Sequence, residues 1–342
     1  MKREPFAKSA DGQAVERITI TNKNGLTARF ITWGASLTEL HAPDRAGKFA
    51  DVTLGFDTAD PWLQPHPFFG ATAGRFANRV AKGKFTIDGK EWTLATNDGA
   101  NHLHGGVVGF DKRNWTLEAT IENSARFTYT SPDGEEGYPG TLKVSVTYTL
   151  TDADELRLDY EATTDKPTIV NLTNHTYWNL GASPDILAHE LRLPAATYVA
   201  VDAGSIPTGQ LAPSAEAMDF QKAKVIGKDI AALATAPGGG YDHNWVIDGW
   251  VAGKQAFAAE LYDASSGRVM RVSTTEPGIQ FYTGNYINNV AGKSGRTYGK
   301  FAGLCLETQH FPDAPNQPTF APTTLRPGET FRSTTVYQFS VR

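Results

Sequence analysis

Alternation of apolar and polar residues runs through almost the whole chain and limits its possible folds more than any other feature. Glu155-Leu-Arg-Leu-Asp-Tyr-Glu161 alternates strictly, with the period of a strand that buries one face. Lys84–Asp88 and Glu91–Leu94 flank Gly89-Lys90 and predict a hairpin. Further strands are predicted at 17–21, 26–32, 126–130, 141–150, 256–262, 269–273, 303–309 and 334–341, and only 225–234 is helix-like.

The pattern predicts an all-β protein in which large, twisted antiparallel sheets pack as a sandwich. A chain of 342 residues is long enough for one large core, and no linker-like run or repeat of fixed period divides it. We therefore expect a single domain over residues 1–342. The Pro-rich segment Pro312–Pro327 lies between two predicted strands, so we interpret it as an ordered loop.

Composition excludes several classes of function. The formal net charge is −5 and no basic run indicates nucleic acid, while no apolar run approaches a transmembrane span. No apolar stretch follows Met1-Lys-Arg-Glu-Pro-Phe6, so no signal peptide is visible. A single cysteine, Cys305, excludes an internal disulfide. We expect a cytoplasmic protein, with a periplasmic or secreted location left open if a leader was removed. A monomer and a homodimer fit the sequence equally.

The most unusual segment is Asn171-Leu-Thr-Asn-His-Thr-Tyr-Trp-Asn-Leu180, which is rich in amides and aromatics and has no charged residue apart from its histidine. A buried row of polar groups is costly unless a partner hydrogen-bonds to it, and a polyhydroxylated ligand such as a sugar would do so. A structural histidine in a strand is the alternative interpretation. As a strand, the segment would place on one face Asn171, Thr173, His175, Tyr177 and Asn179.

Two glycine-containing clusters could hold a ligand. Gly74-Arg-Phe-Ala-Asn-Arg79 offers two guanidinium groups, each a rigid fork of donors that suits vicinal hydroxyls, although a solvated turn would look similar. Asn101-His-Leu-His-Gly-Gly106 carries a His-x-His pair, which on a strand would point both rings the same way. No carboxylate or cysteine lies nearby in sequence to complete a metal site, so we expect no metal.

Three later clusters add polar groups to the strand background. Gly240-Tyr-Asp-His-Asn-Trp245 sets a carboxylate among aromatic rings, although an Asx turn would give the same pattern. In 276–285, Gln280 and Tyr282 share a strand face. In 303–310, Glu307 lies in an otherwise apolar strand and shares a face with Cys305. Glutamate is rarely buried without a partner, so Glu307 is a candidate functional residue, with an outward-facing glutamate as the alternative.

Taken together and in order, these clusters resemble the aldose 1-epimerase, or galactose mutarotase, family. The resemblance spans almost the whole chain and shows no departure at a functional position. It implies a β-supersandwich fold and interconversion of the α and β anomers of a free monosaccharide, with no cofactor or metal. The segments that carry it are 74–79, 101–106, 171–180, 241–245, 278–285 and 306–309.

The resemblance also implies roles for individual residues. His175 corresponds to the general acid and Glu307 to the general base. The residues that would hold the sugar hydroxyls are Arg75, Asn78, Arg79, His104, Asp242 and Gln280. This chemistry needs one carboxylate and one imidazolium within hydrogen-bond reach of the sugar. Neighbouring carboxylates could keep His175 protonated by raising its pKa.

Three alternatives remain open at this point. A non-catalytic carbohydrate-binding module would use the same hydroxyl-binding residues without needing the His175–Glu307 pair. A glycoside hydrolase or lyase on a related β-sandwich is the second alternative; a hydrolase would need two carboxylates, which Asp242 and Glu307 could supply. A hexose-phosphate epimerase would need an additional cluster of arginine or lysine for the phosphate, and the sequence shows none.

Overall fold

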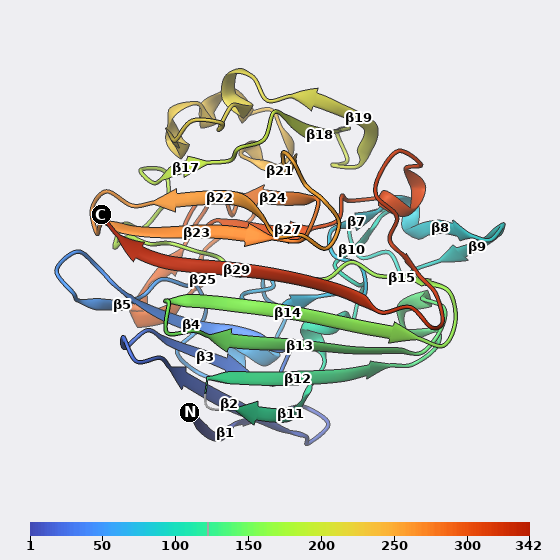
Figure 1. The fold of residues 1–342 in the computed structure, drawn as a ribbon, viewed down its shortest axis with the longest axis horizontal. Helices are drawn as coiled ribbons and strands as arrows, with labels where there is room; N and C mark the ends of the chain where they lie inside the picture. The colour runs from blue at the N-terminus through green and yellow to red at the C-terminus, as the bar shows by residue number, and fades with distance from the viewer. Residues whose placement is uncertain (122) are drawn as a thin grey trace.

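The computed structural model describes residues 1–121 and 123–342 and consists of β-strands joined by loops and short 3₁₀ turns. Its largest sheet has nine strands in the order β11-β12-β13-β14-β29-β23-β22-β17-β20, most of which run one above another in Figure 1. The strands are β11 (Thr116–Ile121), β12 (Ser124–Ser131), β13 (Leu142–Leu150), β14 (Glu155–Thr164), β17 (Glu190–Arg192), β20 (Lys224–Val225), β22 (Ala256–Tyr262), β23 (Arg268–Thr274) and β29 (Phe331–Val341).

The alternation seen in the sequence decides which face of this sheet is buried. In β13, Val144, Val146 and Tyr148 are buried, whereas Lys143 is exposed. The antiparallel register of β13 with β14 pairs Val146 with Tyr160, so the buried side chains of neighbouring strands share one face.

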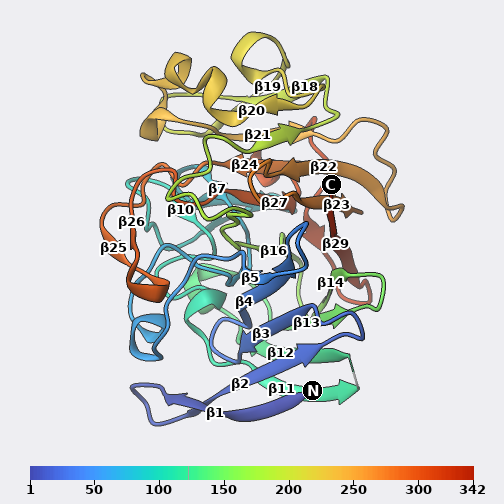
Figure 2. The same cartoon turned by 90° about the vertical axis from the view of Figure 1, so that its left-hand side faces the viewer.

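Two five-stranded sheets complete the main architecture. The N-terminal sheet, in the order β1-β2-β3-β4-β5, lies beside β11–β14 in Figure 2. The other has the order β19-β18-β21-β24-β27 and carries the polar clusters of the last third of the chain. The strands are β1 (Lys2–Lys8), β2 (Ala14–Thr21), β3 (Thr27–Ile31), β4 (Ser36–Pro43), β5 (Phe49–Asp51), β18 (Thr197–Val201), β19 (Pro207–Pro213), β21 (Asp242–Val246), β24 (Gly278–Tyr282) and β27 (Cys305–Gln309).

One apolar core joins the three large sheets. It includes Phe30 from β3, Tyr148 from β13 and Phe281 from β24, all fully buried. Phe30 packs on Tyr148 with ring centroids 4.4 Å apart, which ties the N-terminal sheet to the nine-stranded sheet. Strands that are distant in sequence are therefore held in fixed positions around the pocket described below.

Short elements fill the gaps between the sheets. The two-stranded pairs are β10 (His102–Leu103) with β7 (Arg79–Val80), β15 (Thr168–Ile169) with β28 (Thr324–Leu325), β16 (Thr173–Asn174) with β6 (Thr72–Ala73), β25 (Val290–Ala291) with β26 (Thr297–Tyr298), and β8 (Lys84–Ile87) with β9 (Lys90–Thr93). The 3₁₀ turns are η1 (Asp60–Leu63), η2 (Ala81–Gly83), η3 (Phe110–Lys112), η4 (Glu135–Gly137), η5 (Glu216–Met218), η6 (Ile226–Lys228), η7 (Ile230–Leu233), η8 (Pro237–Gly239), η9 (Lys293–Gly295) and η10 (Ala314–Asn316).

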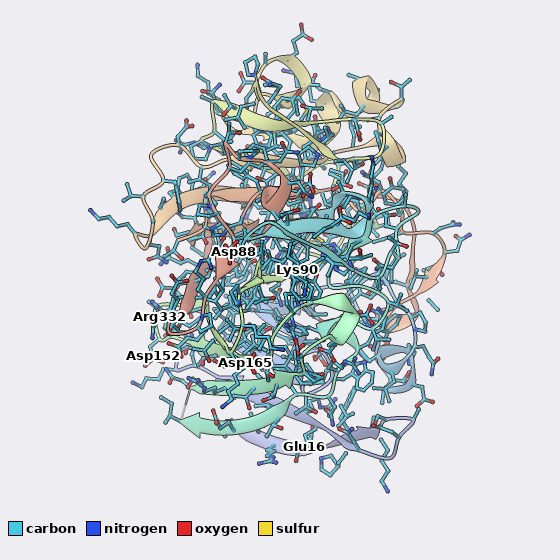
Figure 3. The ribbon with its side chains drawn as sticks, turned by 90° about the vertical axis from the view of Figure 1, so that its right-hand side faces the viewer. Glu16, Asp88, Lys90, Asp152, Asp165 and Arg332 are labelled. Atoms are coloured by element: carbon cyan, nitrogen blue, oxygen red, sulfur yellow. The ribbon has the colours of Figure 1, made fainter. Side chains whose placement is uncertain are left out.

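The predicted all-β class and the predicted hairpin are confirmed. Ile87 pairs with Lys90, so the turn is Asp88-Gly89, one residue earlier than predicted; Asp88 and Lys90 are labelled in Figure 3. The helix-like segment 225–234 forms two short 3₁₀ turns, η6 and η7, and Pro312–Pro327 is a loop that contains η10 and β28. Within the described residues, no helix is both long and apolar enough to cross a membrane.

The interpretation of residues 171–180 as one continuous strand is wrong. Only β16 is a strand there, paired with β6, and Trp178 makes isolated bridges to Thr53 and Leu304. The segment is buried throughout and passes between several elements, so its backbone partners change every few residues. Period-two alternation therefore does not continue along it.

Candidate functional site

A pocket of about 380 Å³ opens where the loops of the N-terminal half meet β21, β24 and β27, a volume within the usual range for a small-molecule site. Most of the polar residues predicted for the site lie in its wall. The pocket is lined by Pro67, Phe68, Asn78, Arg79, Asp98, Leu103, His104, His175, Tyr177, Asp242, Tyr282, Tyr286 and Glu307.

His175 reaches the pocket from the buried segment that follows β16. Its backbone N–H donates to the carbonyl of Ala71 at 2.9 Å, which fixes the start of the segment against β6. Tyr177 also lines the pocket. The other members of the expected polar row serve the fold: side-chain donors of Asn171, Thr173 and Asn179 bond to backbone carbonyls, among them those of His310, Thr308 and Ala302.

Glu307 lies at the middle of β27, directly opposite Gln280 of β24 in the strand register. Its side chain is 2% exposed, and its Oε2 atom has no hydrogen-bond partner among the described residues. Burial, and secondarily the charge of Asp242, raise the pKa of Glu307 well above its usual value. A buried carboxyl with an open acceptor at the pocket wall is suited to exchange a proton with a ligand.

His175 and Glu307 face each other across the base of the pocket, with Nε2 of the imidazole 3.8 Å from Oε2 of the carboxyl. Burial lowers the pKa of His175 to about 4, contrary to the expectation that nearby carboxylates would raise it. The carboxyl pKa moves up and the imidazole pKa moves down, so both shifts favour the uncharged forms. When the unliganded pair holds one proton, these shifts favour neutral imidazole beside protonated Glu307 over the charged pair.

Two hydrogen bonds join His104 to the backbone of Asn78. The N–H of Asn78 donates to Nδ1 of His104 at 3.2 Å, and the N–H of His104 donates to the carbonyl of Asn78 at 3.0 Å. Because Nδ1 accepts this hydrogen bond, the neutral ring carries its own hydrogen on Nε2. Gly105, with φ +94°, permits the turn: a Cβ there would lie 1.6 Å from the carbonyl oxygen of Gly74.

The other wall of the pocket is a set of paired polar groups. Nε of Arg79 donates to Oδ2 of Asp98 at 2.8 Å, and Nε2 of Gln280 donates to Oδ1 of Asp242 at 2.7 Å. Asp242 and Arg79 line the pocket, whereas Gln280 does not. Gln280 is thus placed to orient a lining carboxylate, and the structure does not put it among the groups that would touch a ligand.

The structure contradicts the expected contact of Arg75 with a ligand. Arg75 is 1% exposed and is absent from the pocket wall. All five of its N–H donors are used: Nε donates to Oγ of Ser131, and the two terminal nitrogens donate to four carbonyls. Those carbonyls belong to Ser131, Pro132, Pro139 and Gly140. Arg75 therefore fastens the 131–140 loop and has no donor left for a sugar.

Three pocket groups lie close enough to be considered as metal ligands. One atom each of His104, His175 and Glu307 lies within 4.8 Å of the others, and two imidazoles with a carboxylate form a set that zinc uses. The hydrogen bond from Asn78, however, leaves the proton of His104 on Nε2, the nitrogen that faces this cluster. His102 points elsewhere, toward the carbonyl of Ala95 and the hydroxyl of Tyr138. The set fits sugar hydroxyls better than a cation.

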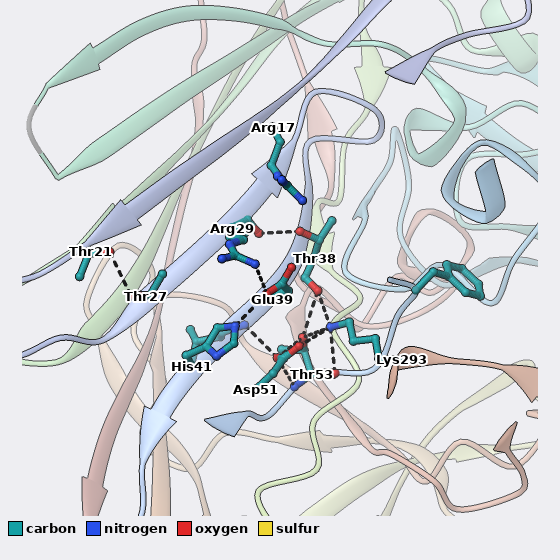
Figure 4. Close-up of polar contacts among 12 residues, drawn as sticks. Arg17, Thr21, Thr27, Arg29, Thr38, Glu39, His41, Asp51, Thr53 and Lys293 are labelled. Carbon is teal, nitrogen blue, oxygen red and sulfur yellow. Dashed lines mark hydrogen bonds and ion pairs between the residues drawn. The ribbon is translucent and has the colours of Figure 1, made fainter. Parts of the chain in front are cut away.

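A second group of possible ligands, Glu39, His41 and Asp51, lies outside the pocket on β4 and β5. Its carboxylates already have cationic partners, as Figure 4 shows. Arg29 donates to Glu39 at 2.6 Å, and Lys293 donates to Asp51 at 2.6 Å. These ion pairs account for the cluster without a metal.

Several lining residues were not predicted. Asp98 lies in a loop, and the sequence offers only an Asn-Asp-Gly turn there. Tyr286 follows β24 and is 58% exposed at the pocket lip, with its ring stacked on Tyr282 at a centroid distance of 6.3 Å. The ring of Phe68 stacks on His175 at 5.5 Å. Only the run of aromatics around 281–286 hinted at any of these.

Comparison with known proteins places the chain among sugar epimerases. The family model described as aldose 1-epimerase matches residues 16–338. Galactose mutarotase from Rattus norvegicus is 48% identical over 96% of this chain and 95% of its own length. Aldose 1-epimerase from Escherichia coli K12 is 37% identical over 99% of both chains.

Solved structures agree with this placement. An aldose epimerase homologue from C. elegans superposes with a TM-score of 0.89 at 34% identity, covering 96% of this chain and 99% of its own. Galactose 1-epimerase from Lactobacillus acidophilus NCFM gives a TM-score of 0.84 at 29% identity, covering 99% and 98%. The predicted fold, a β-supersandwich of the galactose mutarotase type, is confirmed.

Proposed function

The chain belongs to the aldose 1-epimerase family, and from that membership and its pocket we propose that it interconverts the α and β anomers of a free aldose such as glucose or galactose. The observation that carries the proposal is the buried His175–Glu307 pair, 3.8 Å apart at the base of a pocket lined by polar and aromatic groups. A carboxyl and an imidazole at this spacing can act on two oxygens of one sugar ring.

Anomer exchange moves protons between oxygens and breaks one C–O bond. Glu307, as carboxylate, removes the proton from the C1 hydroxyl, while imidazolium His175 delivers one to the ring oxygen. The C1–O5 bond opens to an aldehyde, rotation about C1–C2 presents the other carbonyl face, and the reverse transfers close the ring. The pair carries one proton throughout the cycle. This proton must pass from Glu307 to His175 before the ring opens.

The remaining pocket groups are suited to hold the sugar. His104 presents an Nε2–H donor, Arg79 offers guanidinium donors, and Asp242 offers acceptors for adjacent hydroxyls. Asn78 acts partly through His104, whose ring it orients. Gln280 acts through Asp242. Aromatic rings can pack on the C–H faces of a pyranose, and the pocket provides them in Phe68, Tyr177, Tyr282 and Tyr286.

Charge in the pocket favours an uncharged sugar over a sugar phosphate. Among the described lining residues, Arg79 is the sole lysine or arginine, and Asp98 already pairs with it. A phosphate would also face the carboxylate of Asp242. A hydrolase, a binding module and a mutarotase could all use the same hydroxyl-binding groups. An experiment is therefore needed to separate the three.

Polarimetry of freshly dissolved α-D-glucose or α-D-galactose tests the proposal. Catalytic amounts of protein should speed the decay of optical rotation toward its equilibrium value. Proton NMR of the same sugar in deuterated buffer should show no carbon-bound deuterium and no second sugar, because no C–H bond is cleaved. Sugar binding without faster decay would instead support a binding module, and deuterium at C1 or C2 would contradict the proton-transfer route.

The proposal also covers the domain organisation, the partner, the oligomeric state and the location of the protein. We expect one domain over residues 1–342, a monosaccharide as the partner, no nucleic acid, and a monomer or homodimer in a cytoplasmic location. Full-length coverage of the relatives and the −5 net charge support these expectations. Sedimentation and cell fractionation would test the oligomeric state and the location.

A further inference from the structure

One strand, β27, contacts both ring nitrogens of His175. Glu307 places Oε2 3.8 Å from Nε2, and Cys305 places its Sγ 3.5 Å from Nδ1. The two side chains share a face because they are two residues apart on the strand. All three groups are buried, and the thiol is completely so. The register of β27 therefore fixes the imidazole between a carboxyl and a thiol.

We propose that Cys305 is a positioning residue for the general acid: Nδ1–H of His175 donates to the sulfur, which leaves Nε2 as the atom that takes up and gives the proton. The inference rests on the proposed function. In the catalytic cycle Nε2 receives the proton held by Glu307 and passes it to the ring oxygen of the sugar, and Nδ1–H stays on the sulfur throughout. Cys305 changes neither its protonation nor its oxidation state.

The Cys305 thiol suits the role of acceptor for Nδ1–H of His175 because it is neutral. Burial raises the pKa of Cys305 well above its usual value, so the sulfur keeps its hydrogen and offers only weak lone pairs. A weak neutral acceptor can hold the ring orientation and tautomer without stabilising the imidazolium strongly. Since the ring oxygen of a sugar is a very weak base, an imidazolium of low pKa is a better acid toward it.

A second histidine in the same protein shows what a charged partner does. Nδ1 of His310 lies 2.6 Å from Oε2 of Glu276, and this carboxylate raises the pKa of His310 although burial opposes the shift. His310 follows the last residue of β27, and Glu276 lies just before β24. A carboxylate at Nδ1 thus accompanies the raised pKa of His310, and a thiol at Nδ1 accompanies the lowered pKa of His175.

Other titratable groups also surround His175 and bear on its proton. The ring of His104 lies 5.0 Å away and that of Tyr177 5.1 Å away, from the loop after β10 and from its own segment. Tyr282 of β24 lies at 6.3 Å, and the charge of His66, when present, lowers the pKa of His175. Replacing Cys305 leaves all of these groups in place, so its effect can be measured alone.

The experiment is NMR of the ¹⁵N-labelled, ligand-free protein, with the His175 signals assigned by their loss in His175→Asn. Wild type should show the Nδ1–H tautomer. Cys305→Val keeps the apolar volume but removes the acceptor, whereas Cys305→Ser keeps a neutral acceptor. We expect Cys305→Val to weaken the preference for the Nδ1–H tautomer, since the hydrogen bond between the ring and the backbone of His175 itself remains. It should lower kcat by about 10- to 100-fold, the range for removing the outer partner of a metal-bound histidine. KM should change little, and Ser should stay closer to wild type.

The outcomes separate this inference from the proposed function. An Nε2–H tautomer in wild type, or a Cys305→Val protein with unchanged tautomer and kcat, would overturn it. Equal losses in Val and Ser would also overturn it, because packing would then explain both. The tautomer of the ligand-free protein is read without catalysis, so failure of wild type in polarimetry would reject the mutarotase proposal alone. If Cys305→Val does not fold, the wild-type and Ser spectra still decide.

Discussion

The backbone N–H of Asn78 donates to Nδ1 of His104, and the carbonyl of Asn78 accepts the N–H of His104 in return. Two residues from different loops thus form one unit, braced by the pairing of β7 with β10. The unit turns an Nε2–H donor into the pocket. A hydroxyl oxygen of a sugar would accept from that donor, whereas a metal would require the same nitrogen without its hydrogen.

Activity should therefore survive exhaustive dialysis against EDTA. The proposed proton transfers need no Lewis acid, and His104 presents the wrong tautomer for a ligand at Nε2. The check is the polarimetric rate before and after chelation, with the metal content measured in parallel. Loss of activity that one added metal restores would instead identify His104, His175 and Glu307 as ligands.

Replacing either member of the catalytic pair should reduce turnover strongly. Glu307→Gln and His175→Asn should each lower kcat by about 10²- to 10⁴-fold, the usual contribution of one general acid or base. The double variant should be little worse than either single one, because the two residues act as a unit.

Glu276→Gln is a matched control for that experiment, since it neutralises another buried glutamate that lies outside the pocket wall. It should lower the melting temperature but leave kcat near wild type. Near-wild-type kcat in purified Glu307→Gln or His175→Asn would remove that residue from the mechanism.

The plot of kcat/KM against pH should be bell-shaped. Its acid limb should lie below the ordinary pKa of histidine, and its alkaline limb should lie above the ordinary pKa of glutamate. The free pair is active with one proton. Below the pKa of His175, about 4, the imidazole is protonated as well, so the pair holds two protons and no base remains. Above the raised pKa of Glu307, the pair loses its only proton and no acid remains. Rates from acid to alkaline pH, with circular dichroism to exclude unfolding, test this. An acid limb near the ordinary histidine pKa, about 6.5, would contradict the shift.

Much of the fold could be read from the sequence because its long strands bury only one face. In β14 this alternation runs from Leu156 to Ala162, and in β13 it is interrupted at Ser145, which is buried, so the existence of both strands and most of their inward residues were predictable. Their neighbours were not, since pairing such as β14 with β29 joins residues far apart in the chain. Segment 171–180 was misread because it is buried on all sides, and its side chains have no solvent face to mark the period.

The site divides in the same way. His175 and Glu307 were recognisable because each sits in a segment whose chemistry does not suit a plain strand. Arg75 and Arg79 look equivalent in sequence, and only the distant 131–140 loop, which takes up every donor of Arg75, separates them. Asp98 arrives from a loop, so its position depends on tertiary structure that no local pattern records.

Arg79 and Arg75 should therefore respond differently to the same substitution. Arg79→Met removes a charged donor from the pocket wall and should raise KM by about 10- to 100-fold, the equivalent of one hydrogen bond to a charged group. Arg75→Met leaves several loop carbonyls unpaired and should lower the free energy of unfolding by roughly 3 kcal/mol, with KM unchanged. Kinetics and denaturant melts of both variants decide between them. A raised KM in a folded Arg75→Met protein would return Arg75 to the binding site.

Lys293 should be a stability residue that acts from outside the pocket. Its side chain is 10% exposed, and its ammonium bonds to Asp51 at 2.6 Å and to the hydroxyl and carbonyl of Thr53 at 2.9 and 3.1 Å (Figure 4). These bonds tie the 290–298 segment to the N-terminal sheet. Lys293→Met would leave the Asp51 carboxylate partly buried without its cation, which should cost roughly 3 kcal/mol of unfolding free energy.

The control is Lys84→Met, which removes an exposed ion pair with Glu91 whose partners are 50% and 59% exposed. Exposed pairs contribute little, because water and salt screen them, so this variant should melt like wild type. Denaturant melts of the three proteins at low and high salt make the comparison. The Lys293→Met loss should persist in high salt, since a buried pair is poorly screened. Equal stability of the two variants would mean that water already satisfies Asp51, and that the 290–298 segment is held by its apolar contacts alone.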